Sequence, residues 1–314
     1  MDRYRALVDA HVEQWANSLP SGPLYAPMAY LMRLPAKRVR PVLTLMACEL
    51  FGGRLEDALD GSLGIELFHN FTLMHDDIMD RSPIRRGLPT VHVKWDVNAA
   101  ILSGDAMLVK AYGLMGRDPR VLGLFGRAAL EVCEGQQLDM DFEQRDEVSV
   151  EEYRSMIRLK TAVLLSCALQ VGATIANASK ADTDAIGRFG EQLGLAFQLR
   201  DDVLDAFGDP GVTGKQRGGD LRAGKKTGLL IRGEQVARER GRSELREELY
   251  RPSDERDVVR MIAVLEDLGI RREAEAEVGR CEALAIEALD AIAAAEARKA
   301  PLRALAEGLM GRQA

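Results

Sequence analysis

Aromatic residues and cysteines are scarce in this sequence, and positive charge is not in excess. Aromatic residues make up 5% of the 314 residues, against 46% hydrophobic and 29% charged, a composition that favours packed helices over a β-sandwich. The four cysteines, Cys48, Cys133, Cys167 and Cys281, form no C-x-x-C pair, which favours buried thiols over a metal site. A formal net charge of -7 argues against a nucleic-acid-binding face.

Long uncharged runs are also missing, with one exception. Residues 161–178 carry no charge but contain polar side chains such as Gln170 and Asn177, so we expect a buried helix and no transmembrane segment. The charged start, residues 1–5, is not followed by an apolar segment, which favours the absence of a signal peptide. We therefore expect a cytoplasmic protein.

Helical periodicity recurs along almost the whole chain, and no segment shows the period-two alternation of half-buried strands. We expect an all-α protein with one domain, 1–314. The predicted helices cover about 2–18, 42–51, 55–80, 96–115, 119–140, 149–178, 182–207 and, near the C-terminus, 272–297. Loops are predicted at the proline cluster 20–27 and over the glycine-rich, basic segment 208–228.

Two aspartate motifs indicate the chemistry. Asp76-Asp77-Ile78-Met79-Asp80 and Asp201-Asp202-Val203-Leu204-Asp205 both read D-D-x-x-D. On a helix the first and fifth positions project from one face, so their carboxylates can share a cation. Carboxylate oxygens with no cysteine and few histidines select Mg²⁺ or Mn²⁺, and Mg²⁺ often completes its shell with substrate phosphates. One such motif is easily a solvated helix end, but two predict metal ions with a diphosphate between the clusters.

Basic residues follow each motif. Arg85-Arg86 comes after the first motif, Lys215 and Lys225-Lys226 come after the second, and Lys37-Arg38-Val39-Arg40 opens a helix. Any one of these runs is typical of a solvated surface. Beside metal-binding carboxylates they favour phosphate binding, because guanidinium forks and ammonium groups compensate the charge that the metals leave over.

These motifs, in this order, resemble those of the trans-isoprenyl diphosphate synthase family over nearly the whole chain. The motifs that carry the resemblance are Lys37-Arg38-x-Arg40-Pro41, His75 to Asp80 with Arg85-Arg86-Gly87, Lys160-Thr161, Phe197 to Asp205, and Gly214-Lys215 to Thr227. One departure is Pro35-Ala36, where the family often has Gly-Gly. The resemblance implies a single helical bundle of the isoprenoid synthase fold, with a central cavity lined by two Asp-rich helices, and a homodimer.

The resemblance also implies roles for individual residues. Three Mg²⁺ ions, for which Mn²⁺ substitutes, are expected on Asp76, Asp80 and Asp201, with Asp77, Asp202 and Asp205 in support through waters. The allylic diphosphate is expected on Arg85, Lys160, Lys215 and Lys225, and the isopentenyl diphosphate on Lys37, Arg40, His69 and Arg86, with Asp220 as a further substrate-binding residue. Thr161 and Gln198 are expected to stabilise an allylic cation, and the segment 208–224 to act as a lid.

The implied reaction is the head-to-tail condensation of isopentenyl diphosphate with a dimethylallyl, geranyl or farnesyl diphosphate. In the family, side chains four and five residues before the first aspartate, here Thr72 and Phe71, help to set product length. One Phe beside a small Thr favours a geranylgeranyl (twenty-carbon) product over a farnesyl or longer one. A terpene cyclase is disfavoured because the second motif is not N-D-x-x-S-x-x-x-E, and a non-catalytic regulatory subunit because both aspartate motifs are intact.

Overall fold

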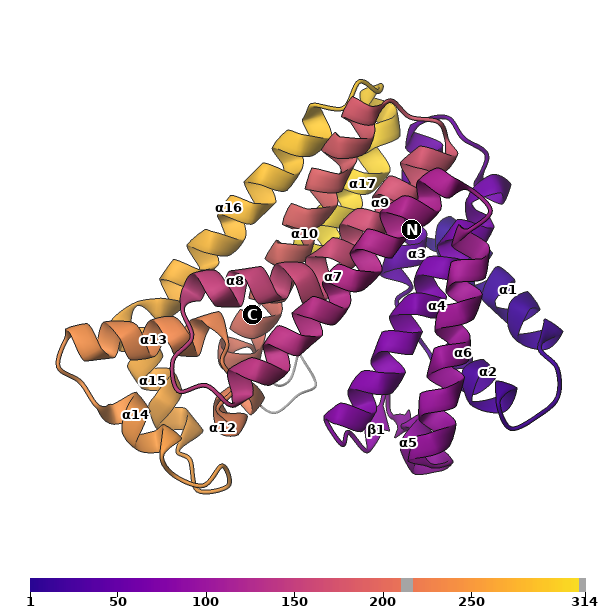
Figure 1. Cartoon of the computed structure of the whole chain (residues 1–314). Coiled ribbons are helices and arrows are strands. Elements are labelled where there is room, and N and C mark those ends of the chain that lie inside the picture. The colour runs from indigo at the N-terminus through magenta and orange to yellow at the C-terminus, as the bar shows by residue number, and fades with distance from the viewer. Residues whose placement is uncertain (210–216, 311–314) are drawn as a thin grey trace. The chain divides into compact units, whose positions relative to one another are not determined.

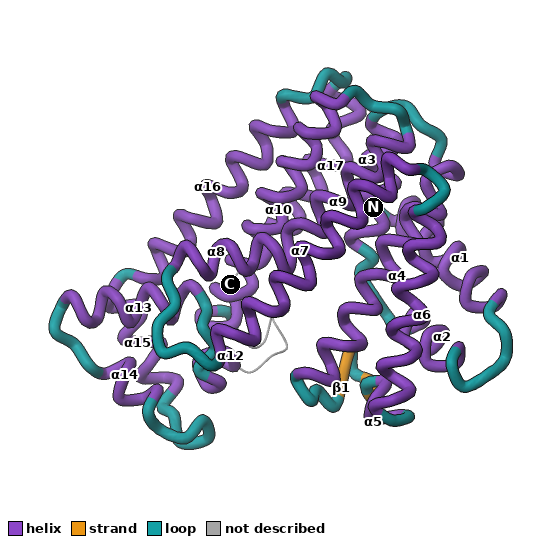
Figure 2. The backbone as a smooth tube through the Cα atoms, viewed as in Figure 1, coloured by secondary structure: helices purple, strands orange, loops and turns teal. Residues whose placement is uncertain are grey.

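The computed structural model describes residues 1–209 and 217–310, and most of them are helical, which confirms the all-α prediction (Figures 1 and 2). Within these residues the only sheet is a hairpin of β1 (Ile84–Arg85) and β2 (Leu88–Pro89). The chain divides into two compact units. The first unit contains Met1–Ala129, Cys167–Gly187 and Ile292–Leu302, and the second contains Leu130–Ser166, Arg188–Ala291 and the chain from Arg303 onward.

The first unit is built around α4, which packs against α3 and α6. Every residue from Gly61 to Phe68 of α4 is buried, as expected of a core helix that is enclosed on all sides. The elements that lie wholly in this unit are α1 (Asp2–Ser18), α2 (Tyr25–Arg33), α3 (Val39–Leu50), α4 (Leu55–Met79), β1, β2, α5 (Val91–Lys94) and α6 (Val97–Met115). Helices α7 (Pro119–Glu143), α9 (Val163–Ile175), α10 (Lys180–Phe207) and α17 (Glu296–Met310) contribute residues to both units.

The second unit contains α8 (Val150–Ile157), a π-helical turn η1 (Arg158–Ala162), and the helices α12 (Gly219–Ala223), α13 (Gly228–Glu239), α14 (Glu244–Leu249), α15 (Val258–Leu268) and α16 (Ile270–Asp290). Side-chain caps define the start of three of them, α8, α13 and α15. The Ser149 hydroxyl accepts from the backbone N–H of Glu152, and the Glu152 carboxylate accepts from that of Ser149, forming a capping box before α8. The Thr227 hydroxyl accepts from the Leu230 N–H and so begins α13.

Some local predictions were wrong. The proline cluster was expected to be a loop, but α2 starts at Tyr25 and holds Pro27 in its first turn, where the backbone N–H has no helical partner to lose. The C-terminal helical pattern breaks after Asp290, and a separate helix starts at Glu296. The expected glycine-rich loop contains the short helix α12, while residues 210–216 of that segment lie outside the described residues.

The hairpin after the first aspartate motif was also missed. Arg86 and Gly87 form its two-residue loop, with φ values of 54° and 78°. Two central residues with positive φ are typical of the type I′ turn that joins antiparallel strands. Arg86 therefore lies at the tip of the hairpin that follows α4.

One helical stretch, Val150–Ile175, is long and apolar enough to cross a membrane by length and composition. Its most apolar window has a mean hydropathy of 1.3, and 67% of that window is buried inside the protein. Burial of this extent is what a core helix of a folded protein shows, as the sequence predicted.

Candidate functional site

The first aspartate motif occupies the last turn of α4. Asp76 is half-buried and Asp80, the C-cap residue, is exposed. Carboxylates at a helix C-terminus face the negative end of the helix dipole and repel each other, so a cation there is strongly favoured. Only oxygen donors are present in this turn, which fits a hard ion such as Mg²⁺.

Asp77, between them, has a different environment. It is 2% exposed, and both of its carboxylate oxygens accept from Nε of Arg85 at 2.8 Å. A further contact joins Nη2 of Arg85 to Oδ1 of Asp77 at 2.7 Å. Asp77 therefore fixes the guanidinium of Arg85, which β1 carries.

A group of cations lies at the start of α3 and on the hairpin. Nη1 of Arg40 lies 3.2 Å from Nε2 of His69, and Arg86 is close enough to repel a proton on this imidazole. Burial, and next the charges of Arg40 and Arg86, keep the pKa of His69 well below its usual value, so the ring is neutral. Burial also lowers the pKa of Arg40 to about 10, which leaves it charged at neutral pH.

This group has spare hydrogen-bond donors. Nε of Arg40 and Nη1 of Arg86 are buried and have no hydrogen-bond partner among the described residues. A buried N–H without an acceptor costs roughly 1–3 kcal/mol, so the pair is suited to receive an anion. Lys37, three residues before Arg40, is exposed.

Sequence reasoning missed the structural role of Arg38. Arg38 is 5% exposed and Glu66 only 1%, and Nη1 of Arg38 donates to Oε1 of Glu66 at 2.6 Å. The Asn70 amide donates to the same oxygen at 3.0 Å. Arg38 has a φ of 51°, so this buried ion pair holds the strained turn from which Arg40 projects. The signal in the sequence was Glu66, a charged residue within an apolar helix core.

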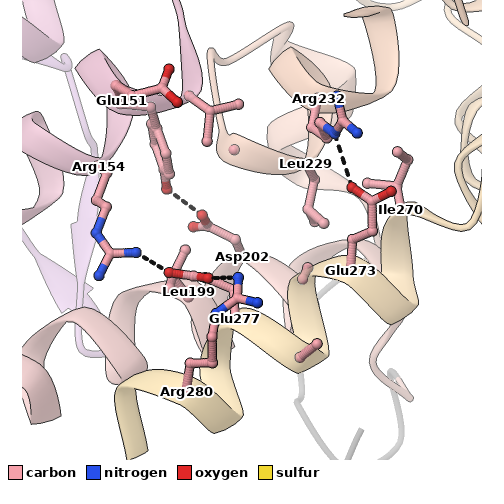
Figure 3. Close-up of a pocket in the computed structure, with 15 residues that line it drawn as sticks. Glu151, Arg154, Leu199, Asp202, Leu229, Arg232, Ile270, Glu273, Glu277 and Arg280 are labelled. Carbon is pink, nitrogen blue, oxygen red and sulfur yellow. Dashed lines mark hydrogen bonds and ion pairs between the residues drawn. The ribbon is translucent and has the colours of Figure 1, made fainter. Parts of the chain in front are cut away.

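The second aspartate motif lies near the end of α10. Asp201 is exposed and Asp205 half-buried, whereas Asp202 is 5% exposed. The Tyr153 hydroxyl donates to Oδ2 of Asp202, and Nε2 of Gln198 donates to Oδ1 at 3.2 Å. Burial raises the pKa of Asp202 to about 7, although both hydrogen bonds act in the opposite direction. Asp202 faces a cavity of about 550 Å³ lined by α8, α10, α13 and α16 (Figure 3).

The π-helical turn η1 carries Lys160 and Thr161. Nζ of Lys160 lies 2.5 Å from Oδ2 of Asp139, and the Thr161 hydroxyl donates to Oε1 of Gln198 at 3.3 Å. Such turns insert an extra residue into an α-helix and often occur at functional sites. Here the wider turn brings the threonine hydroxyl to the α10 glutamine.

Two glycines make room for this turn. A Cβ on Gly135 of α7 would lie 2.3 Å from the Lys160 nitrogen, and a Cβ on Gly194 of α10 would lie 2.5 Å from Cα of Ala162. The backbones of α7 and α10 therefore approach η1 closer than any other residue type allows.

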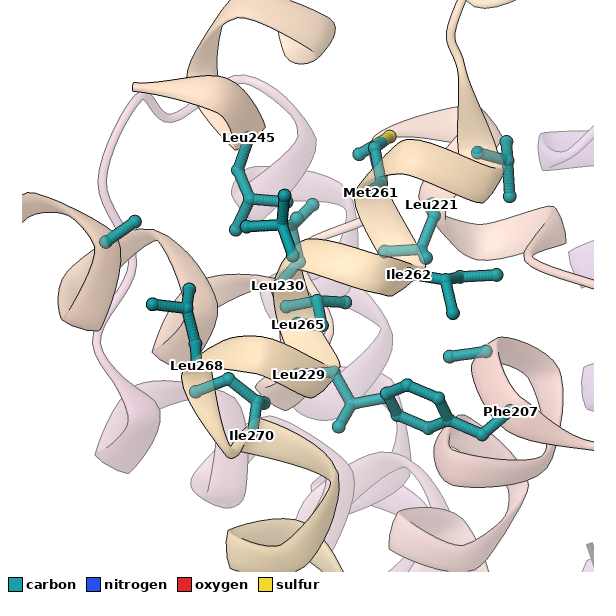
Figure 4. Close-up of a cluster of buried hydrophobic side chains, with 14 of the residues drawn as sticks. Phe207, Leu221, Leu229, Leu230, Leu245, Met261, Ile262, Leu265, Leu268 and Ile270 are labelled. Atoms are coloured by element: carbon teal, nitrogen blue, oxygen red, sulfur yellow. The ribbon is translucent and has the colours of Figure 1, made fainter. Parts of the chain in front are cut away.

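The helix α12 holds its first turn against the second motif. The Asp220 N–H donates to Oδ2 of Asp205 at 3.0 Å, and Leu221 anchors α12 in a cluster of buried side chains that includes Ile262 and Leu229 (Figure 4). The Lys225 N–H donates to the Asp220 carbonyl oxygen at 2.9 Å. Lys215 lies outside the described residues.

The predicted chain-length residues lie one turn before the first motif. The ring of Phe71 packs against those of Phe68 and His75, with centroid separations of 5.6 and 4.8 Å. The Thr72 hydroxyl donates to the His69 carbonyl oxygen at 2.8 Å.

The structure thus brings the predicted residues together in local groups. In the first unit these are Asp76, Asp77 and Asp80 with Arg85, and Arg40 with His69 and Arg86; in the second unit they are Thr161 with Gln198 and Asp202, and Asp205 with Asp220. Among residues 1–209 and 217–310, no three His, Cys, Asp or Glu side chains converge into a ready-made metal site.

Comparison with known proteins gives a consistent answer. Residues 22–266 match the polyprenyl synthetase family. The chain is 41% identical over 231 residues to a geranylgeranyl diphosphate synthase of Methanosarcina mazei, covering 71% of each chain.

Solved structures agree with this match. A geranylgeranyl pyrophosphate synthase superposes with a TM-score of 0.94 at 40% identity, covering 100% of this chain and 99% of that one. The enzyme of Corynebacterium glutamicum, solved with isoprenyl diphosphate and magnesium, superposes with a TM-score of 0.87 at 29% identity, covering 99% of both chains. Other relatives are named geranylfarnesyl diphosphate synthases. The chain therefore belongs to the polyprenyl synthetase family and is a trans-prenyl diphosphate synthase with the isoprenoid synthase fold.

Proposed function

We propose that this synthase extends an allylic diphosphate with isopentenyl diphosphate and releases geranylgeranyl diphosphate as its main product. The observation that carries the product length is the pair of side chains one turn before Asp76. Phe71 is large and held by two neighbouring rings, whereas Thr72 is small and turned to the α4 backbone. A single bulky side chain supports a twenty-carbon product over the fifteen-carbon farnesyl product. A product longer than twenty carbons could form only if Phe71 did not block the growing prenyl chain.

We further propose a metal centre on the two aspartate motifs. The family uses divalent metal, and we assign three Mg²⁺ ions, replaceable by Mn²⁺, to Asp76, Asp80 and Asp201, with Asp205 in support through water. Asp77 and Asp202, also expected in support, are left out of this assignment because they are buried and bonded to Arg85 and Tyr153. Bound metal ions neutralise the charge that develops on a departing diphosphate. The support for this assignment is that these carboxylates, at helix surfaces, belong to D-D-x-x-D motifs made of oxygen donors alone.

We assign the isopentenyl diphosphate to Lys37, Arg40, His69 and Arg86. Spare buried donors on both arginines support the assignment, because a diphosphate oxygen satisfies each of them. His69 is neutral, so it orients Arg40 and the anion without adding a charge that burial opposes.

We assign the allylic diphosphate to Arg85, Lys160, Lys215 and Lys225, near Asp220. Two of these cations are already oriented, Arg85 by Asp77 and Lys160 by Asp139. In the reaction the C1–O bond of the allylic diphosphate breaks, and the double bond of isopentenyl diphosphate attacks C1. The hydroxyl of Thr161 and the carbonyl oxygen of Gln198 stabilise the positive charge at C1, and the proton lost afterwards goes to the released diphosphate.

An assay of starters and products tests the proposal. Purified protein is incubated with Mg²⁺, isopentenyl diphosphate and dimethylallyl, geranyl or farnesyl diphosphate in turn, and the products are measured by mass spectrometry. We expect geranylgeranyl diphosphate from every starter. A hydrocarbon product would indicate a cyclase, and no product a regulatory subunit; a shorter or longer diphosphate would contradict the product length alone.

We also propose a homodimer that forms through α6. This helix exposes Leu102, Val109 and Tyr112, with 60%, 70% and 37% of their surfaces accessible, along one face. Exposed apolar side chains at this spacing are typical of a helix that packs against a partner. Light scattering is expected to show a dimer, and Leu102→Glu with Val109→Glu a monomer; a wild-type monomer would contradict the proposal.

The thiols support a cytoplasmic location. None of the four cysteines is in a disulfide, and three of them are buried. Thiols remain reduced in the cytosol. Fractionation with an antibody to the native protein tests the location, and recovery in an oxidising compartment would contradict it.

A further inference from the structure

A chain of hydrogen bonds connects α8, α10 and the π-helical turn within the second unit. The Tyr153 hydroxyl donates to Oδ2 of Asp202, Nε2 of Gln198 donates to Oδ1 at 3.2 Å, and the Thr161 hydroxyl donates to Oε1 of Gln198 at 3.3 Å. Tyr153 is 3% exposed and Asp202 5% exposed. Water therefore competes only weakly for the hydrogen bond between Tyr153 and Asp202.

This chain of hydrogen bonds determines which way the Gln198 amide faces. A glutamine amide has an oxygen that accepts and a nitrogen that donates. An ionised Asp202 accepts from this amide, so the nitrogen faces Asp202 and the oxygen faces Thr161. The reversed amide would set its oxygen against a carboxylate oxygen.

Tyr153 in turn determines where the Asp202 carboxylate lies. Gln198 and Asp202 are four residues apart on one face of α10, so the aspartate can meet the amide without help from another helix. Its second oxygen is buried and needs a donor of its own, which the Tyr153 hydroxyl supplies from α8. Both oxygens of Asp202 are then occupied inside the protein.

We propose that Tyr153 is a positioning residue for catalysis: through Asp202 it holds the Gln198 amide with its oxygen toward the allylic carbon. Asp202 then serves this hydrogen-bond chain, and Asp201 and Asp205 carry the metal function of the second motif. This inference rests on the proposed role of Gln198 and Thr161 in stabilising the allylic cation.

The kinetic test removes only the hydroxyl. Tyr153→Phe keeps the ring that packs beside Gly228 but leaves Oδ2 of Asp202 without its donor. We expect kcat to fall about tenfold or more, as losses of one buried hydrogen-bond partner do, with both KM values and the Mg²⁺ concentration for half-maximal rate changed less than about twofold. Tyr250→Phe is the matched control, because Tyr250 is 76% exposed; it is expected to leave all these values unchanged.

A double mutant separates positioning from a general loss of structure. In a Gln198→Ala background there is no amide for the hydrogen bonds to orient. Adding Tyr153→Phe is therefore expected to lower kcat by less than about a further threefold. A full tenfold loss in that background, or a higher Mg²⁺ requirement in the single variant, would overturn the proposal.

A measurement without turnover keeps this inference distinct from the proposed function. The side-chain NH₂ signal of Gln198 in ¹⁵N-labelled protein, assigned by its absence in Gln198→Ala, is expected to shift in Tyr153→Phe and to stay in place in Tyr250→Phe. An unmoved signal would contradict the proposed chain of hydrogen bonds, even if the enzyme is active. If the wild-type protein makes no prenyl diphosphate, the proposed function fails while this signal still decides whether Tyr153 orients the amide.

Discussion

At the scale of single residues, the two aspartate motifs share one pattern of burial. In each motif the second aspartate, Asp77 or Asp202, is buried, whereas the first and fifth are half-buried or exposed. Helix geometry explains this, because position five is rotated only about 40° from position one but position two about 100°. The motif therefore combines two more accessible carboxylates, which we propose serve the metal ions, with an inward-facing anchor.

Substitutions of the two kinds of aspartate are expected to change different kinetic constants. Asp80→Asn should raise the Mg²⁺ concentration for half-maximal rate at least tenfold, because it removes a proposed ligand. Asp77→Asn should leave that value unchanged but raise the KM for the allylic diphosphate about tenfold, because Arg85 loses its charged partner. Magnesium titrations of steady-state rate measure both, with Asp57→Asn at the exposed start of α4 as the control. Equal metal dependence in the two variants would contradict the division of roles.

His69 predicts a dependence of stability on pH. Its pKa in the folded protein lies well below the 6.5 of the unfolded chain, so on acidification the unfolded chain takes up a proton that the folded protein refuses. This contribution to stability is present above pH 6.5 and is lost, by up to about 1.4 kcal/mol per pH unit, as the pH falls below it.

Thermal unfolding between pH 7.5 and 5.5 measures this effect. His69→Gln is expected to lose less stability than the wild-type protein over that range, while His92→Gln is expected to follow the wild type. An equal or larger loss in His69→Gln would show that the imidazole takes up its proton in the folded state.

Phe71 predicts the length of the product. Phe71→Ala should lengthen the main product by at least one five-carbon unit, because the proposed floor is removed. Mass spectrometry of the dephosphorylated products measures it, with Phe51→Ala at the end of α3 as the control. An unchanged product would place the floor on other side chains.

At the scale of elements, the sequence predicted long helices well and interruptions poorly. The bounds of α1, α4 and α6 agree with the expected ranges to within one residue, because their apolar periodicity is regular and their ends carry clear stop signals. The π-helical turn was hidden inside a predicted continuous helix. An extra residue shifts an apolar stripe by about 100°, but the run 161–178 that follows carries no charge and so conceals the shift. The helix α2 was missed because Pro27 indicates a loop unless its place in the first turn is known.

The glycines beside the π-helical turn give a prediction at this scale. Gly135→Ala is expected to lower kcat at least tenfold and the free energy of unfolding by about 1–3 kcal/mol, because the added methyl displaces the backbone of Lys160. Gly126→Ala on the same helix is the control, since nothing lies within 4 Å of its added Cβ. Denaturant unfolding and steady-state kinetics test the pair, and a fully active, fully stable Gly135→Ala would remove the argument for close packing.

At the scale of the whole molecule, the metal-binding candidates come from both compact units, Asp76 and Asp80 from the first and Asp201 from the second. The sequence named these residues through their motifs, but it held no signal for Tyr153 and Asp139, which orient the site, and for Glu66 the only signal was a charge inside an apolar helix core. Those partners are isolated polar residues within helices, and their function depends on which helices pack together. The single-domain prediction and the expected central cavity stay predictions.

The central claim is that the two aspartate motifs hold metal ions on one shared diphosphate. Anomalous diffraction from crystals grown with Mn²⁺ and a non-hydrolysable allylic thiolodiphosphate tests it most directly. The claim predicts Mn²⁺ peaks bonded to Asp76, Asp80 and Asp201, all sharing oxygens of the same diphosphate. Peaks at one motif alone, or a diphosphate bound away from both, would contradict it.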